Sequence, residues 1–119
     1  MDGVATRTYT IAFGSFGLKS MDHAWITSRQ IEAARKVMTR FVRRGGRVWI
    51  RLFPDRPVTK KGNEVPMGGG KGTPDHYVST VKPGMILFEM DGIPKDQAQL
   101  ALREAAQKLP LHARFVEKI

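Results

Sequence analysis

Apolar residues recur at helical spacing between Ile26 and Val42, and this stretch predicts the best-signalled helix of the 119-residue chain. Thr27 is the expected N-cap, and Gln30 three residues later completes a capping box. Glycines follow the stretch, so the helix is expected to end at about Arg43 or Arg44. Its apolar face consists of Ile31, Ala34, Met38, Phe41 and Val42.

Alternating or continuous β-rich runs predict five strands, and a second amphipathic helix lies between Pro94 and Pro110. The expected strands are Thr8–Phe16, Arg47–Phe53, His76–Lys82, Met85–Asp91 and Leu111–Glu117. Because each helix has a single apolar stripe, each should lie on a largely antiparallel or mixed sheet. This order predicts an α+β two-layer fold in one domain over residues 1–119. The expected core includes Ile31, Met38, Phe41, Ile50, Leu52, Phe88 and Leu102.

Residues 54–75 form a loop with four prolines and five glycines in 22 residues. Proline removes a backbone donor and glycine costs conformational entropy, so neither a helix nor a central strand fits this composition. A connection this long within a compact domain is usually functional or disordered. Its glycines would let the backbone approach a bulky anionic surface, although an ordinary surface loop is the plainer interpretation. Three lysines lie among these prolines and glycines, Lys60, Lys61 and Lys71.

Positive charge dominates the chain and is unevenly placed. Twenty Lys and Arg against eleven Asp and Glu give a net charge of +9 and a pI of about 10.4. Such a field favours polyanions, nucleic acid before an anionic membrane. Thirteen of the basic residues lie between Arg29 and Lys82, against four acids, whereas the remaining C-terminal part is balanced. In the first helix Glu32 is the single acid, so phosphates rather than protein carboxylates are the expected counter-charges of its outer face; a merely solvated basic face is the alternative.

Signs of catalysis, metal binding and membrane insertion are weak. The chain has no cysteine, its three histidines lack metal-ligand spacing, and no apolar run approaches the roughly 18 residues of a membrane span. Glu89 and Asp91 share a strand face and could hold a metal or act as an acid/base pair, but exposed strand carboxylates are the expectation. Phe13 and Phe16 could stack a base, but core positions are expected for them. We therefore predict no enzyme activity, no metal and no cofactor.

Six stretches of the chain resemble the bacterial-type ribosomal protein L sixteen family of the large subunit. They are Phe13–Leu18, Arg29–Arg35, Trp49–Arg51 with Phe53–Asp55, Val65–Gly72, Phe88–Met90 and Lys108–Pro110, and they follow the order of the family. The resemblance implies a β-hammerhead α+β fold shared with the archaeal and eukaryotic L ten-e family. It also implies a bacterial-type ribosome, either cytoplasmic or organellar if the gene is organelle-encoded.

The same resemblance implies a structural role with several partners. They are 23S-type large-subunit rRNA near the A site and the peptidyl-transferase region, the 5S rRNA neighbourhood, A- and P-site tRNA, and neighbouring large-subunit proteins, with no membrane. A late role in subunit assembly is also implied.

Charge and resemblance together predict three sets of functional residues. The rRNA-binding set is Arg29, Arg35, Lys36, Arg40, Arg43, Arg44, Arg47, Arg51, Lys60, Lys61 and Lys71. Arg35, Lys36, Arg40 and Arg44 would lie near bound orthosomycin antibiotics, as implied by motif position. The loop expected near tRNA and the peptidyl-transferase centre is Val65, Pro66, Met67, Gly68, Gly69, Gly70, Lys71 and Gly72.

The chain departs from the family pattern at two points. Three other functions would also be consistent with its positive charge. Typical members begin with a basic arm that this sequence does not show, and Pro66 stands where many have an arginine that some species hydroxylate. A free-standing RNA- or single-strand-binding module is the main competing function, and it would be expected to expose aromatics beside its basic groove. A nucleic-acid enzyme and a membrane-surface protein are the second and third.

Overall fold

The structure is a computed structural model that describes residues 9–42, 45–54, 56–58 and 76–118. Seven strands and two helices occur in these ranges. They are β1 (Phe16–Ser20), β2 (Ala24–Thr27), α2 (Ser28–Phe41), β3 (Arg47–Ile50), β4 (Arg56–Val58), β5 (His76–Val81), β6 (Ile86–Asp91), α3 (Lys95–Ala106) and β7 (Ala113–Glu117). Within the described ranges no helix is long and apolar enough to cross a membrane.

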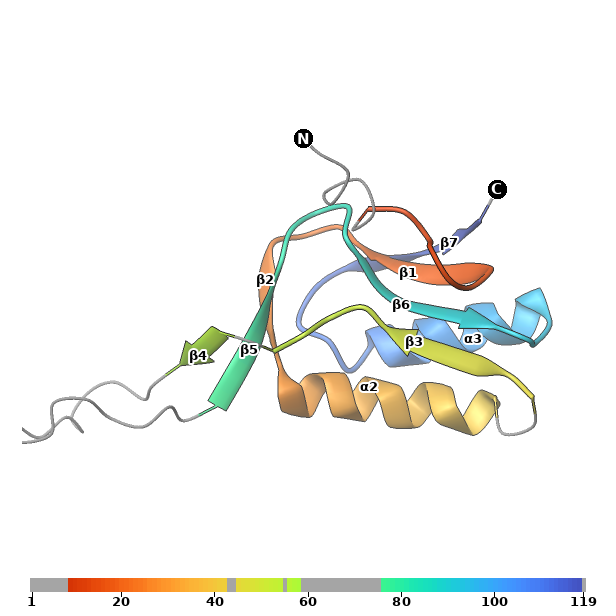
Figure 1. The fold of residues 1–119 in the computed structure, drawn as a ribbon, viewed down its shortest axis with the longest axis horizontal. Helices are drawn as coiled ribbons and strands as arrows, with labels where there is room; N and C mark the ends of the chain where they lie inside the picture. The colour runs from red at the N-terminus through yellow and green to blue at the C-terminus, as the bar shows by residue number, and fades with distance from the viewer. Residues whose placement is uncertain (1–8, 43–44, 55, 59–75, 119) are drawn as a thin grey trace, which may run out of the picture.

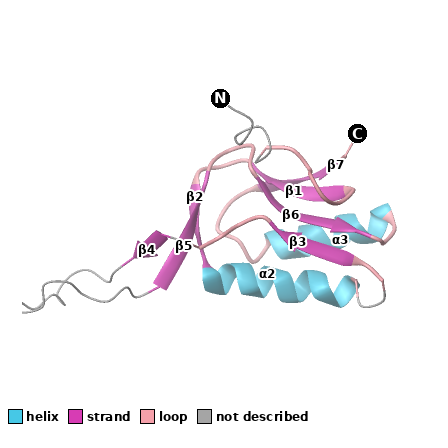
Figure 2. Ribbon diagram, viewed as in Figure 1, coloured by secondary structure: helices cyan, strands magenta, loops and turns pink. Residues whose placement is uncertain are grey.

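The strands form two antiparallel sheets (Figures 1 and 2). The larger sheet has the order β3-β6-β1-β7, and α2 and α3 lie together beneath it as a second layer. The smaller sheet, β2-β5-β4, projects at the end of the molecule where α2 begins. The α+β two-layer prediction is confirmed, but the strands divide between two sheets where one was expected.

The core lies between the larger sheet and the two helices. Phe88 and Met90 of β6 are fully buried there, together with Met38 of α2 and Leu102 of α3. Of the predicted core, Ile31, Met38, Leu52, Phe88 and Leu102 are buried. Phe41 and Ile50 are only half-buried at its margin, because one ends α2 and the other ends the edge strand β3. The buried Val37 was missing from the prediction.

Helix α2 begins as predicted and ends earlier. The Thr27 hydroxyl accepts from the Gln30 N–H at 3.2 Å, and the Gln30 side chain accepts from the Thr27 N–H at 2.9 Å, which completes the capping box. Val42 is already the C-cap, and Gly45 follows with a φ of +94°, a backbone conformation that favours glycine. The helix therefore stops just short of the predicted Arg43 or Arg44, which lie outside the described residues.

The N-terminal strand prediction is wrong in its position. Residues 9–15 contain no strand, and β1 starts only at Phe16. Of their alternating apolar residues, Ile11 packs against Gly17 of β1, whereas Tyr9 and Phe13 are exposed. Three further differences concern strands: β2 was not predicted, β3 ends at Ile50 instead of Phe53, and β4 lies inside the predicted 54–75 loop. Pairing with the distant β5 accounts for β2 and β4, and no local pattern shows such pairing.

Candidate nucleic-acid interface

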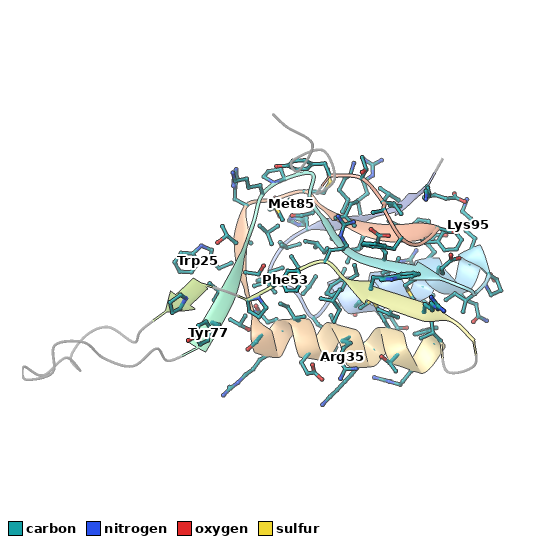
Figure 3. All side chains as sticks on the ribbon, in the orientation of Figure 1. Trp25, Arg35, Phe53, Tyr77, Met85 and Lys95 are labelled. Atoms are coloured by element: carbon teal, nitrogen blue, oxygen red, sulfur yellow. The ribbon has the colours of Figure 1, made fainter. Side chains whose placement is uncertain are left out.

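The outer face of α2 presents cations to solvent. Ile31, Ala34, Val37 and Met38 turn inward, which places Arg29, Lys36 and Arg40 on the exposed side of the same helix. Arg35 points away from the sheet layer at the edge of this face (Figure 3). We call Arg29, Arg35, Lys36 and Arg40 the α2 basic face.

Only one cation of the α2 basic face has a carboxylate partner within the described ranges. Arg35 pairs with Glu32, its Nε donating at 3.2 Å. The hydrogen bond from Arg35 lowers the pKa of Glu32, and the same bond raises the pKa of Arg35. Arg29, Lys36 and Arg40 keep their charges unpaired within the described part of the chain. Such a helix face offers three strong positions for anionic oxygens.

Arg47 and Arg51 do not belong to this face. They lie with Trp49 on the side of the larger sheet away from the helices, since Val48 and Ile50 alternate with them and pack against the core. The Arg51 side chain is 13% exposed. It pairs with Glu89, donates to the Thr10 carbonyl at 3.1 Å and thus serves the fold.

Glu89 is buried, so the expectation of an exposed strand carboxylate is wrong. Its oxygens accept from the backbone N–H groups of Ala12 at 3.0 Å, Phe13 at 2.7 Å and Gly14 at 2.7 Å, as well as from Arg51. Burial raises the pKa of Glu89, but these four donors outweigh it and hold the pKa below its ordinary value. A lone acid within the otherwise apolar run Ile86–Met90 was the signal that could have revealed this in the sequence.

The histidines and carboxylates were also considered as metal ligands. Among the described residues no group of three or more His, Cys, Asp or Glu could hold a metal ion. His112 is exposed and its backbone N–H and ring nitrogen meet the Asp22 carboxylate at 2.8 Å and 3.1 Å. Predicted site residues outside the described ranges are Arg43, Arg44, Lys60, Lys61, Val65, Pro66, Met67, Gly68, Gly69, Gly70, Lys71 and Gly72.

Fold and surface together define a small, strongly basic α+β protein with a cationic helix face. Residues 1–116 match the family described as ribosomal protein L16p/L10e, and the chain belongs to that family. It is 52% identical over 119 residues to the large ribosomal subunit protein uL16c of Physcomitrium patens, an alignment that covers 100% of this chain and 86% of that relative.

Family membership fixes the broad role. The protein is a structural constituent of the large ribosomal subunit and not an enzyme, so its partners are rRNA and ribosomal proteins. A role in the ribosome therefore takes precedence over a free-standing RNA-binding module, a nucleic-acid enzyme and a membrane-surface protein. A ribosome of bacterial type, organellar if the gene is organelle-encoded, fits the relationship.

Proposed function

We propose that the α2 basic face is the main surface by which the protein binds large-subunit rRNA. The observation that carries this proposal is that Arg29, Lys36 and Arg40 project from one rigid, capped helix without carboxylate partners in the described part of the chain. Arg43 and Arg44 follow the helix in sequence, so up to six cations lie along this segment with Arg35. Phosphate contacts of this kind position a protein on RNA.

Residues 59–75 would form a second contact, directed at tRNA and the peptidyl-transferase region. The support is the placement of their two ends: Val58 of β4 pairs with His76 of β5, on the sheet that projects from the body (Figure 1). Seventeen residues that leave this base and return to it could reach outward by at most roughly 28 Å at about 3.3 Å per residue. Lys60, Lys61 and Lys71 would meet phosphates, and Val65–Gly72 would lie at the tip.

The finer placement of the protein rests on the family resemblance. It includes proximity to the A site, contact with A- and P-site tRNA, the 5S rRNA neighbourhood and a late role in assembly. Arg35, Lys36, Arg40 and Arg44 would also be the residues nearest a bound orthosomycin. Arg51 is left out of the proposed rRNA surface because its guanidinium already pairs with Glu89.

The salt dependence of rRNA binding tests the α2 basic face. If six cations neutralise about six phosphates, log K should fall against log salt with a slope of roughly −4 to −5. The double reversal Lys36→Glu and Arg40→Glu should weaken binding strongly and reduce the magnitude of the slope by about two. The matched reversal Arg103→Glu and Lys108→Glu, in the charge-balanced part of the chain, should leave both nearly unchanged.

Circular dichroism controls for the fold of both variants, since all four side chains are exposed. An unchanged slope of log K against log salt in the Lys36→Glu, Arg40→Glu variant would contradict the assignment of the RNA surface to α2.

A further inference from the structure

Phe13 and Phe16 have different environments, although the sequence offers both as base-stacking or core residues. Phe16 is a core residue that stacks on Phe115 with ring centroids 5.8 Å apart. Phe13 is 57% exposed and stacks on Trp49, with centroids 6.0 Å apart and an interplanar angle of 20°. The core expectation is thus correct for Phe16 and wrong for Phe13, which leaves a supported aromatic ring at the surface.

The Phe13 ring is held in place by its surroundings. Its backbone N–H donates to the buried Glu89 carboxylate at 2.7 Å, and the Arg51 guanidinium carbon lies 5.5 Å from the ring centroid. A Cβ added at Gly14 would lie 3.0 Å from Trp49 Cζ3, so the indole packs directly on that backbone. An exposed ring fixed in this way loses little freedom when a ligand stacks on it.

A pocket of about 310 Å³ lies beside this ring. Its walls are Phe13, Gly45, Arg47, Trp49, Asp91 and Gly92. Arg47 and Asp91 face each other in the β3–β6 register, yet these two described residues form no ion pair within 4 Å.

Both charged side chains line the pocket and have atoms that make no hydrogen bond or ion pair among the described residues. Asp91 Oδ1 accepts from the Ser15 hydroxyl at 3.1 Å and from the Gly92 N–H at 2.8 Å, while Oδ2 has no hydrogen-bond partner among the described residues. Arg47 is exposed and equally unpaired within those ranges.

We propose that this pocket holds one unstacked nucleobase of the ribosomal RNA. The base would stack on Phe13, its phosphate would meet Arg47, and its exocyclic amine would donate to Asp91 Oδ2. This inference rests on the proposed function, but it places a further RNA contact on the sheet face opposite the α2 basic face.

Three observations favour RNA over a protein side chain as the occupant. The volume is at the small end of the roughly 300–1,000 Å³ typical of ligand pockets, which suits a single ring system. A cation, an unused acceptor and a flat aromatic ring meet in it, and these are the groups that recognise phosphate, base edge and base face. The net charge of +9 also concentrates polyanions around the molecule.

The test uses Trp49 as its own reporter. The chain has two tryptophans, so Trp25→Phe in the full 119-residue protein leaves Trp49 as the single fluorophore. Titration with AMP, CMP, GMP and UMP, and with short single-stranded RNA, should change its fluorescence saturably. Bases that bear an exocyclic amine should bind more tightly than uracil, and Asp91→Asn should narrow that difference.

Phe13→Ala should weaken nucleotide binding by roughly five- to 140-fold, the equivalent of about 1–3 kcal/mol per stacked base. Phe53→Ala is the matched control, because Phe53 is 73% exposed and lines no part of this pocket. Phe13→Leu, which keeps an apolar side chain without a π face, covers the case in which Phe13→Ala does not fold.

Failure of this proposal is distinguishable from failure of the proposed function. Phe13→Ala should keep the salt slope of rRNA binding, and Lys36→Glu with Arg40→Glu should keep nucleotide binding at Trp49. The pocket is overturned as a base site if no nucleotide gives a saturable change, or if Phe13→Ala or Phe13→Leu binds as tightly as Phe53→Ala. Either result would leave the pocket without a role in RNA binding.

Discussion

Glu89 ties the N-terminal segment to the sheet at the scale of single residues. Its carboxylate is 0% exposed and accepts from three successive backbone N–H groups, those of Ala12, Phe13 and Gly14. Arg51 supplies the compensating positive charge. A buried carboxylate without such donors would be neutralised instead of ionised. The pair therefore holds Phe13 beside Trp49, which shapes the pocket proposed for a nucleobase.

Replacing Glu89 by glutamine should lower the free energy of unfolding by about 3–5 kcal/mol, because it breaks the buried end of the ion pair with Arg51. Urea unfolding measures this. Glu32→Gln is the matched control, because Glu32 makes a solvent-exposed pair with Arg35 and its replacement should lower the free energy of unfolding far less. Equal losses in the two variants would contradict the structural role of Glu89.

Acidification gives a second test of Glu89. Its pKa in the folded protein lies below the ordinary value of 4.5. The ionised group therefore stabilises the fold fully above that ordinary value, and the stabilisation is lost as the pH falls through the lower folded-state pKa. Stability of the parent should fall more steeply below about pH 4.5 than stability of Glu89→Gln.

The roles of Arg51 and Glu89 could not be predicted from local sequence. Arg51 resembles one more cation of the basic stretch, because its partner is 38 residues away. Glu89 resembles an exposed strand acid, because its backbone donors lie 75 to 77 residues earlier. The exposure of Arg29, Lys36 and Arg40 could be predicted from local sequence, since helical spacing alone separates them from the buried residues of α2.

Helix α2 shows which features of an element local sequence determines. The capping box and the glycines after the helix predicted its two ends to within a few residues, because both signals act on the helix's own backbone. The division into two sheets could not be predicted in this way. β2 and β4 are short, and each exists through its pairing with β5.

The packing of α2 against the larger sheet makes different demands on two phenylalanines. Phe88 is fully buried in β6, so Phe88→Ala should lower the free energy of unfolding by about 3–5 kcal/mol. Phe41 is half-buried in the last turn of α2, so Phe41→Ala should cost clearly less, contrary to the sequence-based expectation of a full core loss. Chemical denaturation of both variants measures the difference, and a larger loss for Phe41 would show that the helix faces are wrongly assigned.

The whole molecule has a compact body and a projecting sheet, and these can be tested separately. Because the paired residues of β4 and β5 lie outside Gly62–Gly72, replacing that segment with a short Gly-Ser linker should shift Tm by only a few degrees. Ribosomes that carry the shortened protein should be impaired in peptide-bond formation or late subunit maturation. Fully active ribosomes would leave the segment as an ordinary surface loop.

The most direct measurement of the central claim is co-sedimentation with large ribosomal subunits at moderate salt. Purified subunits lacking the protein would be mixed with the parent, with the Lys36→Glu, Arg40→Glu variant, or with the Arg103→Glu, Lys108→Glu control. The parent and the control should sediment with the subunits. The α2 variant should remain in the supernatant, because its two glutamates repel the phosphates that Lys36 and Arg40 would contact. Retention of the α2 variant at the parental level would contradict the claim that the α2 basic face anchors the protein to rRNA.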